Sequence, residues 1–510
     1  MTTVGPTVWG QVVDTFTLDD LTPALLVGSL VLLVSVAAVR ISVRSGLPSL
    51  LLFLGIGLVL GEGGLGIRFD SASLTQVLGY AALVLILAEG GLTTKWSGVR
   101  SAVAPAAILS TVGVLVSVGV VAIAAHFVLH IDWAIAFLIG AILSSTDAAA
   151  VFSVLRTVPL PKRLGGLLEA ESGFNDAPVV ILVVALAGQS VPSAEHHPWY
   201  VLLLEASLEL VGGAVIGLAI GYAGGWLVRR VAGTSSALFS IGVVSVAVLA
   251  YATAASAHTS GFIATYLAAL VLGNMGLPHR SAVTGFASAA GSIAQIGLFV
   301  LLGLLAAPQR LASQVVPALV VGFVLLLLAR PLSVLVSLTP FGFRWREQAF
   351  LSWAGLRGAV PVVLATVPAT VGTVGAEWIF DLVFVLVVIF TIIQAPTLPW
   401  VARRLGLTDT LQQVDLHVET TPLDTMGADV IEVTIGDTSR LHGVEVFELR
   451  LPPGANLTLV VRDGSSFVPQ GRTVLRHQDQ LLIVTTAAAR KAAEARVRAV
   501  DADGRLAGWA

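Results

Sequence analysis

The chain has 510 residues, of which 56% are hydrophobic and only 12% are charged, with a mean hydropathy of +0.92. About a quarter of the residues in a soluble globular protein carry charge, so this composition excludes an ordinary water-soluble enzyme. The net charge of −3 and the scattered basic residues exclude a nucleic-acid partner. The chain has no cysteine and its nine histidines form no metal-binding motif, so we expect neither disulfides nor a resident metal.

Apolar stretches long enough to cross a membrane, about 17 to 25 residues each, recur from Thr22 to Arg404 and predict about thirteen membrane helices. The N-terminal twenty residues contain no basic residue and are not typical of a cleavable signal peptide. Basic residues such as Arg229 and Arg230 follow the odd-numbered spans, so the positive-inside rule places the N-terminus outside and the C-terminus in the cytoplasm. We therefore expect an all-α, multi-pass protein of the cell inner (plasma) membrane, with an extracytoplasmic segment at 1–21 and a membrane domain in the lipid bilayer at 22–405. The predicted spans are centred near Val31, Leu54, Val84, Val112, Ala141, Val180, Ala214, Val243, Tyr266, Leu298, Leu325, Val360 and Val388.

The composition changes after Leu407, where charged residues and short alternating apolar runs replace the long apolar stretches. Alternation with a period of two is typical of strands, and turn signals such as Asp463-Gly464 separate the runs. We expect a linker at 406–424, a small cytoplasmic α+β domain at 425–500 and a tail at 501–510. The predicted strands are Val430–Ile435, Leu457–Val461 and Gln480–Val484, and the predicted helix is Ala487–Val497.

The fifth predicted span contains a polar run from Ser144 to Ala150 that includes Ser145, Thr146 and Asp147. A charged side chain inside a span costs about 3 kcal/mol on insertion scales, so it needs a partner or a function. Hydroxyl groups satisfy backbone groups that a helix interruption frees, and irregular backbone at membrane depth is tolerated around an internal cavity. We expect a broken helix with Thr146 and Asp147 at a cavity. The alternative is a small-residue packing face with one buried acid.

The sixth predicted span begins with a second polar run, which contains Glu169, Glu171, Ser172, Asn175 and Asp176. Ser172 and Asp176 are four residues apart and share one helix face, whereas Glu171 and Asp176 are five apart and do not. Hard monovalent cations prefer carboxylate, hydroxyl and carbonyl oxygens. We expect Ser172 and Asp176 to share a cation. The alternative is that Glu169 and Glu171 only cap the start of the helix.

The twelfth predicted span contains Arg357 between Gly355 and Gly358, with Pro361 four residues later, which predicts a second broken helix. A buried guanidinium needs a carboxylate, and pairing with Glu171 would leave Asp176 free to titrate. Spans five and twelve cross the membrane in opposite directions, as expected of inverted repeats whose two broken helices cross. We expect a structural ion pair between Glu171 and Arg357 in this region.

Three further polar residues carry weaker signals. Glu89, followed by two glycines, is a candidate gate or ligand, and the sequence equally supports a place in water at the cytoplasmic surface. Arg330, followed by Pro331, is more typical of a kink whose arginine reaches the membrane interface. Asn274 is a candidate interior hydrogen-bonding group.

These motifs together resemble the NhaP-type branch of the cation/proton antiporters, and most of all the potassium/proton antiporters of the CvrA type. The resemblance covers roughly residues 22–405. It implies a secondary active transporter that is a homodimer, with a dimerisation region and a core built around two crossed broken helices. The motifs that carry it, in chain order, are Ser145-Thr146-Asp147, Glu171-Ser172-x-x-Asn175-Asp176 and Gly355-Leu356-Arg357-Gly358-Ala359-Val360-Pro361.

The resemblance also implies roles for individual residues. Asp176 is the residue that exchanges cation and proton, and Glu171 pairs with Arg357. Asn175 before Asp176 resembles the electroneutral branch, which exchanges one cation for one proton. Sodium-type members often carry proline where Ser145 stands here, so the resemblance favours potassium over sodium. Thr146, Asp147 and Ser172 match positions of the ion site or of the helix crossing.

The end of the chain resembles the C-terminal RCK (TrkA-C) domain. Such domains accompany potassium channels and transporters, commonly dimerise, and bind regulatory small molecules, sometimes nucleotides such as cyclic di-AMP. No GxGxxG stretch precedes it, so the nucleotide-binding half of a full RCK unit is missing. The resemblance implies a regulatory domain, and we expect no other cofactor. The matching stretches are 439–443, 448–452, 461–464 and 478–482.

Desolvation penalises a bare Asp176 carboxylate at membrane depth, so a proton and a cation are alternative ways to neutralise it. If the core crosses the membrane only when Asp176 is neutral, exchange by alternating access follows. One alternative is an RCK-gated potassium channel, but Thr370-Val371-Gly372 lacks the Tyr-Gly of a selectivity filter. Another alternative is a transporter-like membrane sensor. An enzyme is not expected, because no nucleophile, base and orienting residue can be assembled.

Overall fold

The computed structural model describes residues 18–45, 47–67, 69, 71–147, 150, 151, 154, 160–190, 198–231, 235–373, 375, 376, 378–407, 417–423, 428–436, 439–486 and 488–504. These residues form two compact units. One comprises the described residues up to 226 together with 243–275 and 287–407, and the other comprises 227–242, 276–286 and the described residues after 416. Parts of the predictions above lie outside the described residues, namely 1–17, Ala148, Ala149, 408–416, 424–427 and 505–510.

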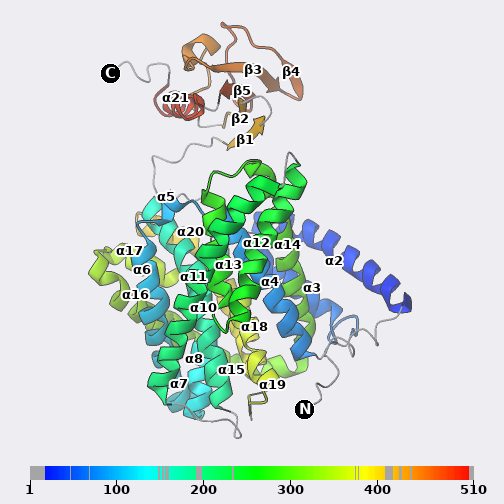
Figure 1. Cartoon of the computed structure of the whole chain (residues 1–510), viewed down its shortest axis with the longest axis vertical. Helices are drawn as coiled ribbons and strands as arrows, with labels where there is room; N and C mark the ends of the chain where they lie inside the picture. The colour runs from blue at the N-terminus through cyan, green and yellow to red at the C-terminus, as the bar shows by residue number, and fades with distance from the viewer. Residues whose placement is uncertain are drawn as a thin grey trace. The chain divides into compact units, whose positions relative to one another are not determined.

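Long apolar helices make up the first unit (Figure 1). Within the described ranges, nine helices are long and apolar enough to cross a membrane, and four further apolar stretches are shorter, Ser49–Leu60, Trp133–Ile142, Gly261–Asn274 and Ala359–Val371. The prediction of a helical, multi-pass membrane protein is therefore confirmed. The helices are α2 (Leu18–Ser45), α3 (Ser49–Leu60), α4 (Ala72–Thr93), α5 (Trp96–Val99), α6 (Val103–Ile108), α7 (Val114–Leu129), α8 (Trp133–Ile142), α10 (Lys162–Gln189), α11 (Trp199–Val231), α12 (Ser236–Ser256), α13 (Gly261–Asn274), α14 (Arg280–Leu305), α15 (Pro308–Val324), α16 (Arg330–Leu338), α17 (Trp345–Trp353), α18 (Ala359–Leu364), α19 (Val367–Val371) and α20 (Ile379–Arg404).

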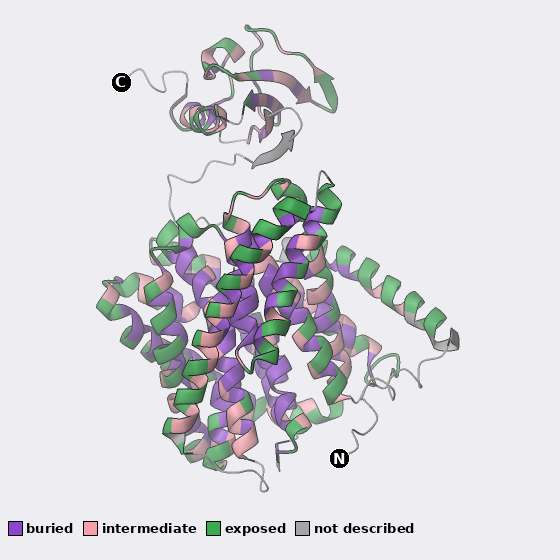
Figure 2. Ribbon diagram, in the orientation of Figure 1, coloured by how far each residue is buried: buried purple, intermediate pink, exposed green. Residues whose placement is uncertain are grey.

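Burial separates central helices from peripheral ones (Figure 2). In their most apolar stretches, 72% of the residues of α20 and 56% of those of α10 are buried, against 11% for α11 and 12% for α2. The peripheral helices expose large apolar side chains such as Leu33 and Val211. Apolar side chains on the outside of a helical unit suit contact with lipid, whereas a soluble protein would turn them inward.

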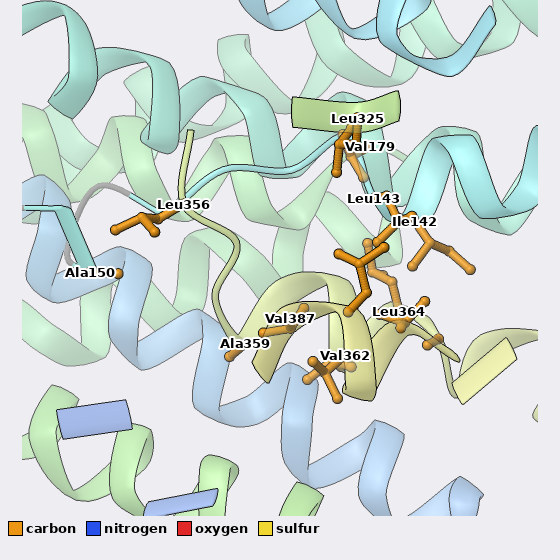
Figure 3. Packing of buried hydrophobic residues seen from close by; sticks show 14 of the residues in the cluster. Ile142, Leu143, Ala150, Val179, Leu325, Leu356, Ala359, Val362, Leu364 and Val387 are labelled. Atoms are coloured by element: carbon orange, nitrogen blue, oxygen red, sulfur yellow. The ribbon is translucent and has the colours of Figure 1, made fainter. Parts of the chain in front are cut away.

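The buried core surrounds two interruptions in the helical structure. The backbone is not helical at 143–147, after α8, nor at 354–358, between α17 and α18. Figure 3 shows Leu143 in the first interruption with Ile142 next to it, Leu356 in the second with Ala359 next to it, and Val179 of α10 in the same buried cluster. Apolar packing therefore holds the two interruptions against the central helix α10.

The C-terminal part of the chain forms a five-stranded antiparallel sheet in the order β1-β2-β5-β3-β4. The predicted small α+β domain is confirmed, and the three predicted strands correspond to β2, β3 and β5. Two further strands were not predicted, since β1 lies in the predicted linker and β4 has only three residues. The elements are β1 (His417–Leu423), β2 (Ala428–Thr434), β3 (Ala455–Arg462), β4 (Ser465–Phe467), β5 (Gln480–Thr486) and α21 (Arg490–Asp503).

Each end of this domain differs from the predicted boundaries for a local reason. β1 pairs along its full length with β2, so it belongs to the sheet although no turn signal separates it from the linker. The helix α21 extends to Asp503, three residues into the predicted tail, because Val497 and Val500 continue its buried face. The Asp463-Gly464 turn forms as predicted, and both residues have positive φ (51° and 77°), which suits a tight two-residue hairpin between β3 and β4.

Candidate functional site

The two non-helical segments contact each other directly. The backbone N–H of Asp147, in the first segment, donates a hydrogen bond of 2.9 Å to the carbonyl of Leu356, in the second. Gly358 makes this approach possible, because a Cβ at that position would overlap the Asp147 carboxylate. The backbone groups that the interruptions free are thus partly satisfied between the segments, as irregular backbone at membrane depth requires.

Arg357 joins the same two segments through its side chain. It is only 3% exposed, and its Nη1 donates to the carbonyls of Ser144 at 2.9 Å and Ser145 at 2.5 Å. These carbonyls lie just after the end of α8, where helix carbonyls lose their intrahelical partners. Arg357 therefore replaces the missing backbone donors at the end of α8.

The carboxylate of Glu171 pairs with a different arginine from the one predicted. Arg330 Nη1 and Nη2 donate to the two oxygens of Glu171 at 2.5 and 2.9 Å, and both side chains are buried. The predicted Glu171–Arg357 pair is corrected accordingly. Arg357 donates instead to backbone carbonyls that the helix interruption frees, and the two terminal nitrogens of Arg330 match the two oxygens of the Glu171 carboxylate. Gly355 leaves room for this arginine, because a Cβ there would lie 2.8 Å from Arg330 Nε.

The reading of Arg330 as an arginine at the membrane interface is also corrected. Arg330 is 5% exposed and begins α16 directly after a π-helical turn, Leu325–Ala329. The sequence signal that identified this partner was available: a charged residue beside the centre of a predicted span is expected to face the interior and pair.

Asp176 is held by a residue of the first non-helical segment. Ser145 Oγ donates to Asp176 Oδ1 at 2.8 Å, and Asp176 is 7% exposed. Ser145 belongs to the quoted motif but was not among the predicted site residues. The geometry therefore adds Ser145 to the site, as the neutral donor to the central carboxylate.

Asn175, next to Asp176 on α10, bonds the same segment from another direction. Its Nδ2 donates to the Ser144 carbonyl at 3.1 Å and to Thr146 Oγ1 at 3.3 Å. Thr146 Oγ1 in turn donates to Glu171 Oε1 at 3.3 Å. One hydrogen-bonded chain thus connects Asn175, Thr146, Glu171 and Arg330, and it fixes the polar segment against α10.

Asp176 also faces a cavity of about 630 Å³. Ser172, Thr146 and Asp147 line this cavity with it, whereas Glu171 and Asn175 do not. Glu89 lines the same cavity, and Gly291 of α14 lies against its carboxylate. The structure therefore brings most of the predicted site residues together around one cavity. Glu171 and Asn175 are outside the lining of this cavity.

Hydrogen bonds connect the end of α4 with α10 and α13 beside this cavity. Thr94 Oγ1 donates to Glu169 Oε1 at 2.5 Å, and both residues line the cavity. Asn274 of α13 accepts from the Trp96 N–H at 2.9 Å and donates to the Thr94 carbonyl at 2.9 Å; it bonds across helices as the sequence suggested, but it is exposed and not in the interior. Glu169 is therefore bonded across helices as well as lying near the start of α10.

The oxygen atoms around the cavity define its chemistry. Carboxylates and hydroxyls suit a hard monovalent cation or a proton. Among the residues that the structure describes, no group of three or more histidine, cysteine, aspartate or glutamate side chains is arranged to hold a metal ion.

Comparison with known proteins identifies the family. Residues 29–404 match the family model described as sodium/hydrogen exchanger, transmembrane. The chain belongs to the sodium/hydrogen exchanger family. Residues 430–498 of this exchanger match the TrkA-C domain. It is thus a member of a family of transporters, not of enzymes, and both predicted resemblances are confirmed.

Several curated relatives resemble the exchanger over most of its length. The K(+)/H(+) antiporter NhaP of Alkalimonas amylolytica is 37% identical over 473 residues, covering 90% of this chain and 80% of that protein. The K(+)/H(+) antiporter NhaP2 of Shewanella oneidensis is 34% identical over 480 residues, covering 91% of this chain and 82% of that protein. The Na(+)/H(+) antiporter NhaS2 of Synechocystis is 29% identical over 341 residues, covering 64% of this chain and 61% of that protein.

A solved structure shows the same fold. The sodium proton antiporter MjNhaP1 from Methanocaldococcus jannaschii, at pH 8, superposes with a TM-score of 0.66 and 21% identity. The match covers 76% of the exchanger and 99% of that chain. The membrane part of the exchanger therefore has the fold of this antiporter.

Proposed function

We propose that the exchanger moves a monovalent cation against protons across the membrane, and that Asp176 binds the two in turn. The observation that carries the proposal is a buried carboxylate, held by Ser145 and open to a cavity with Ser172 and Thr146. A carboxylate in that position is costly unless a proton or a cation neutralises it. The names of two curated relatives above 30% identity, both antiporters, support the same activity.

Coupling follows from the competition at Asp176. A moving core that carries bare Asp176 would take an uncompensated charge across the low-dielectric interior, whereas the protonated and cation-bound forms are neutral. Movement restricted to the neutral forms gives alternating access and strict exchange. Asn175, which cannot ionise, leaves one titrating carboxylate in this pair, so the exchange is electroneutral, with one cation for one proton.

Potassium is the favoured cation. The relatives from Alkalimonas amylolytica and Shewanella oneidensis, both above 30% identity, are K(+)/H(+) antiporters, while NhaS2, a Na(+)/H(+) antiporter, is less similar. The serine at position 145, in place of proline, supports the same choice. Sodium is the competing candidate.

The wider architecture follows the same proposal. In the part of the chain that the structure describes, the nine long helices and the four shorter apolar stretches are the candidates for thirteen spans, arranged as inverted repeats whose two broken helices cross at residues 143–147 and 354–358. The membrane domain is 22–405, and the regulatory domain, predicted at 425–500, also includes β1 and the end of α21 at Asp503, with the N-terminus outside and the C-terminus in the cytoplasm of the cell. The protein forms a homodimer, and the TrkA-C domain binds a regulatory small molecule, with nucleotides such as cyclic di-AMP as the candidate class.

A vesicle assay tests the proposal. Purified exchanger is reconstituted in liposomes with a pH-sensitive dye, and potassium, sodium or lithium salts are added at several pH values. Cation-dependent proton movement is expected, with an apparent cation affinity that weakens as pH falls because protons compete for Asp176. An affinity independent of pH would contradict the shared site. Absence of movement with every cation would favour the sensor, and cation flux without proton movement would favour the channel.

A further inference from the structure

Two histidines of the TrkA-C domain lie with their rings stacked. The ring centroids of His442 and His477 are 3.9 Å apart, and the angle between the ring planes is only 2°. His442 lies between β2 and β3 and His477 between β4 and β5, so two separate segments of the chain meet here. His442 is exposed and His477 is half-buried, so both rings can exchange protons with water. Neither residue belongs to the candidate site around Asp176.

The hydrogen bonds of the two rings fix the positions of their protons. The backbone N–H of His477 donates to Nδ1 of His442 at 3.1 Å, so this nitrogen carries no proton. Nδ1 of His477 lies 2.8 Å from the carbonyl oxygen of Gly436, and since a carbonyl only accepts, this nitrogen carries a proton. His442 is therefore neutral in this arrangement, and only Nε2 of His477 can take a further proton without loss of a bond.

Protonation of His442 is incompatible with this arrangement. A proton on its Nδ1 would point at the backbone N–H of His477, which would lose its acceptor. If His477 is protonated as well, two positive rings face each other at 3.9 Å and repel. Imidazole side chains change their charge between about pH 5 and 8. The contact between the two rings is therefore sensitive to proton concentration near neutrality.

The charged side chains around the pair are exposed or bonded to other groups. Arg440 and Arg476, which lie close to the two histidines in the sequence, are exposed. The buried carboxylate of Asp479 accepts from Arg462 of β3 at 2.7 Å and from the Arg476 N–H at 2.8 Å. The carboxylate of Asp501, on α21, accepts from a serine hydroxyl. Within the described part of the domain, no carboxylate is bonded to either imidazole, so none offsets the charge that protonation adds.

The stacked geometry suits protons and not a shared metal ion. A metal bound to an imidazole lies in the plane of the ring, because the nitrogen lone pair points in that direction. The planes of His442 and His477 are parallel and separate, so no single ion can lie in both. Among the described residues, no further histidine or acidic side chain completes a metal-binding group with them.

Backbone hydrogen bonds flank the stacked pair on both sides. The Ile435 N–H donates to the Asp479 carbonyl at 2.9 Å, and the Leu475 N–H donates to the Val444 carbonyl at 2.9 Å. These bonds do not depend on the charge of an imidazole. Loss of the ring contact would therefore loosen only the residues around the two histidines, while the sheet and its buried core remain.

We propose that His442 and His477 form a proton sensor, through which the pH of the cytoplasm acts on the regulatory domain and changes the rate of exchange. The proposal rests on the proposed exchange function and adds the signal that the domain detects. At high pH the stacked pair holds its two segments together, and protonation of His442 separates them. A transporter that moves protons changes the pH around this domain, so the sensor provides feedback.

Hydrogen–deuterium exchange of the full-length exchanger tests the sensor. Protection of the peptides that contain His477 is compared at about pH 8 and about pH 5, after correction for the direct effect of pH on amide exchange. The wild-type protein should lose protection at the lower pH. His442→Asn combined with His477→Asn should show no change with pH, because asparagine can accept or donate in place of Nδ1 but does not ionise. Protection independent of pH in the wild type, or equally dependent on pH in the double variant, would overturn the proposal.

Exchange measured in inside-out vesicles tests what the sensor does. The dependence of exchange on the pH of the cytoplasmic face should differ between the wild type and the double variant, and the double variant should approach the protein that lacks residues 409–510. His130→Asn is the matched control, because His130 lies in the first unit and has a positive φ of 56°, which asparagine tolerates. It should keep the wild-type profile. A wild-type profile in the double variant would overturn the regulatory role of the pair.

The two measurements separate this proposal from the function on which it rests. Hydrogen–deuterium exchange does not require transport, so a ring contact that ignores pH overturns the sensor even when cation and proton exchange is normal. Absence of cation and proton exchange in the wild type overturns the proposed function and, with it, the role of the sensor in transport.

Discussion

Glu171 and Arg330 form a buried, two-pronged ion pair, with nitrogen to oxygen distances of 2.5 and 2.9 Å. The pair lies behind Asp176 and connects α10 with α16. It also receives a hydrogen bond from Thr146. In the proposed exchange, Glu171 does not compete with Asp176 for the cation, because Arg330 neutralises it.

Removal of one partner of this pair should destabilise the protein strongly. Glu171→Gln leaves Arg330 buried without its carboxylate, and Arg330→Gln leaves Glu171 without its arginine, at a cost of about 3 to 5 kcal/mol each. Thermal unfolding in detergent measures both losses. The double variant should lose much less than the sum of the two single losses, because neither charge is then left alone. Additive losses would contradict the pairing.

Arg357 should behave differently, because it donates hydrogen bonds to backbone carbonyls and does not pair with Glu171. Arg357→Gln removes the donor to the Ser145 carbonyl, whereas the Ser144 carbonyl keeps its bond from Asn175, and an unsatisfied buried group costs about 1 to 3 kcal/mol. Glu171→Gln should not rescue this variant. Unfolding temperatures of the single and double variants provide the test. If Glu171→Gln rescued Arg357→Gln as well as it rescues Arg330→Gln, the result would support the Glu171–Arg357 pair that the sequence suggested.

Ser145→Ala should weaken cation binding without removing exchange. The hydroxyl stabilises the charged Asp176 carboxylate, and a hydrogen bond to a charged group contributes about 1.5 to 3 kcal/mol. Its loss favours the protonated form, so the half-maximal cation concentration at fixed pH should rise about tenfold or more. Dye-based exchange assays across a range of cation concentrations measure the change. Ser144→Ala is the matched control, because Ser144 Oγ bonds only the Gly140 carbonyl; an equal change in both variants would contradict the role of Ser145.

Deletion of residues 409–510 should spare exchange and change its dependence on pH or on a regulatory ligand. The removed residues contain the whole sheet and its own buried core, which includes Ile431, Leu457 and Ile483. The membrane unit keeps its own core in their absence. Exchange rates of the truncated protein at several pH values provide the measurement. Lost exchange in a stable truncated protein would show that the domain is obligatory.

The sequence predicted the parts of this structure that depend on local pattern. Apolar length placed the spans, and the spacing of Ser172 and Asp176 put them on one side of α10, where both line the cavity. The choice between Arg357 and Arg330 depended on which arginine reaches Glu171 across helices, and spacing along the chain contains no such information. A charged residue at the centre of a span pointed to Arg330, but the following proline favoured a kink.

The interruptions were predicted for the same local reasons, and their crossing from the opposite directions of spans five and twelve, but the bond that joins them was not. Ser144 to Asp147 and the glycines around Arg357 indicate breaks in the helix. The hydrogen bond from Asp147 to Leu356 needs the close approach that Gly358 allows, which only the structure shows. Strand β1 was missed because its pairing partner, not its own pattern, places it in the sheet.

The most direct test of the account is proton movement by Asp176→Asn in proteoliposomes. Asparagine nearly preserves the size of the side chain but neither titrates nor neutralises a cation. Wild-type protein should show dequenching of a pH-sensitive dye on addition of potassium, and Asp176→Asn should show none while its unfolding temperature stays near that of the wild type. Cation-coupled proton movement that persists in the folded variant would contradict the central role of Asp176.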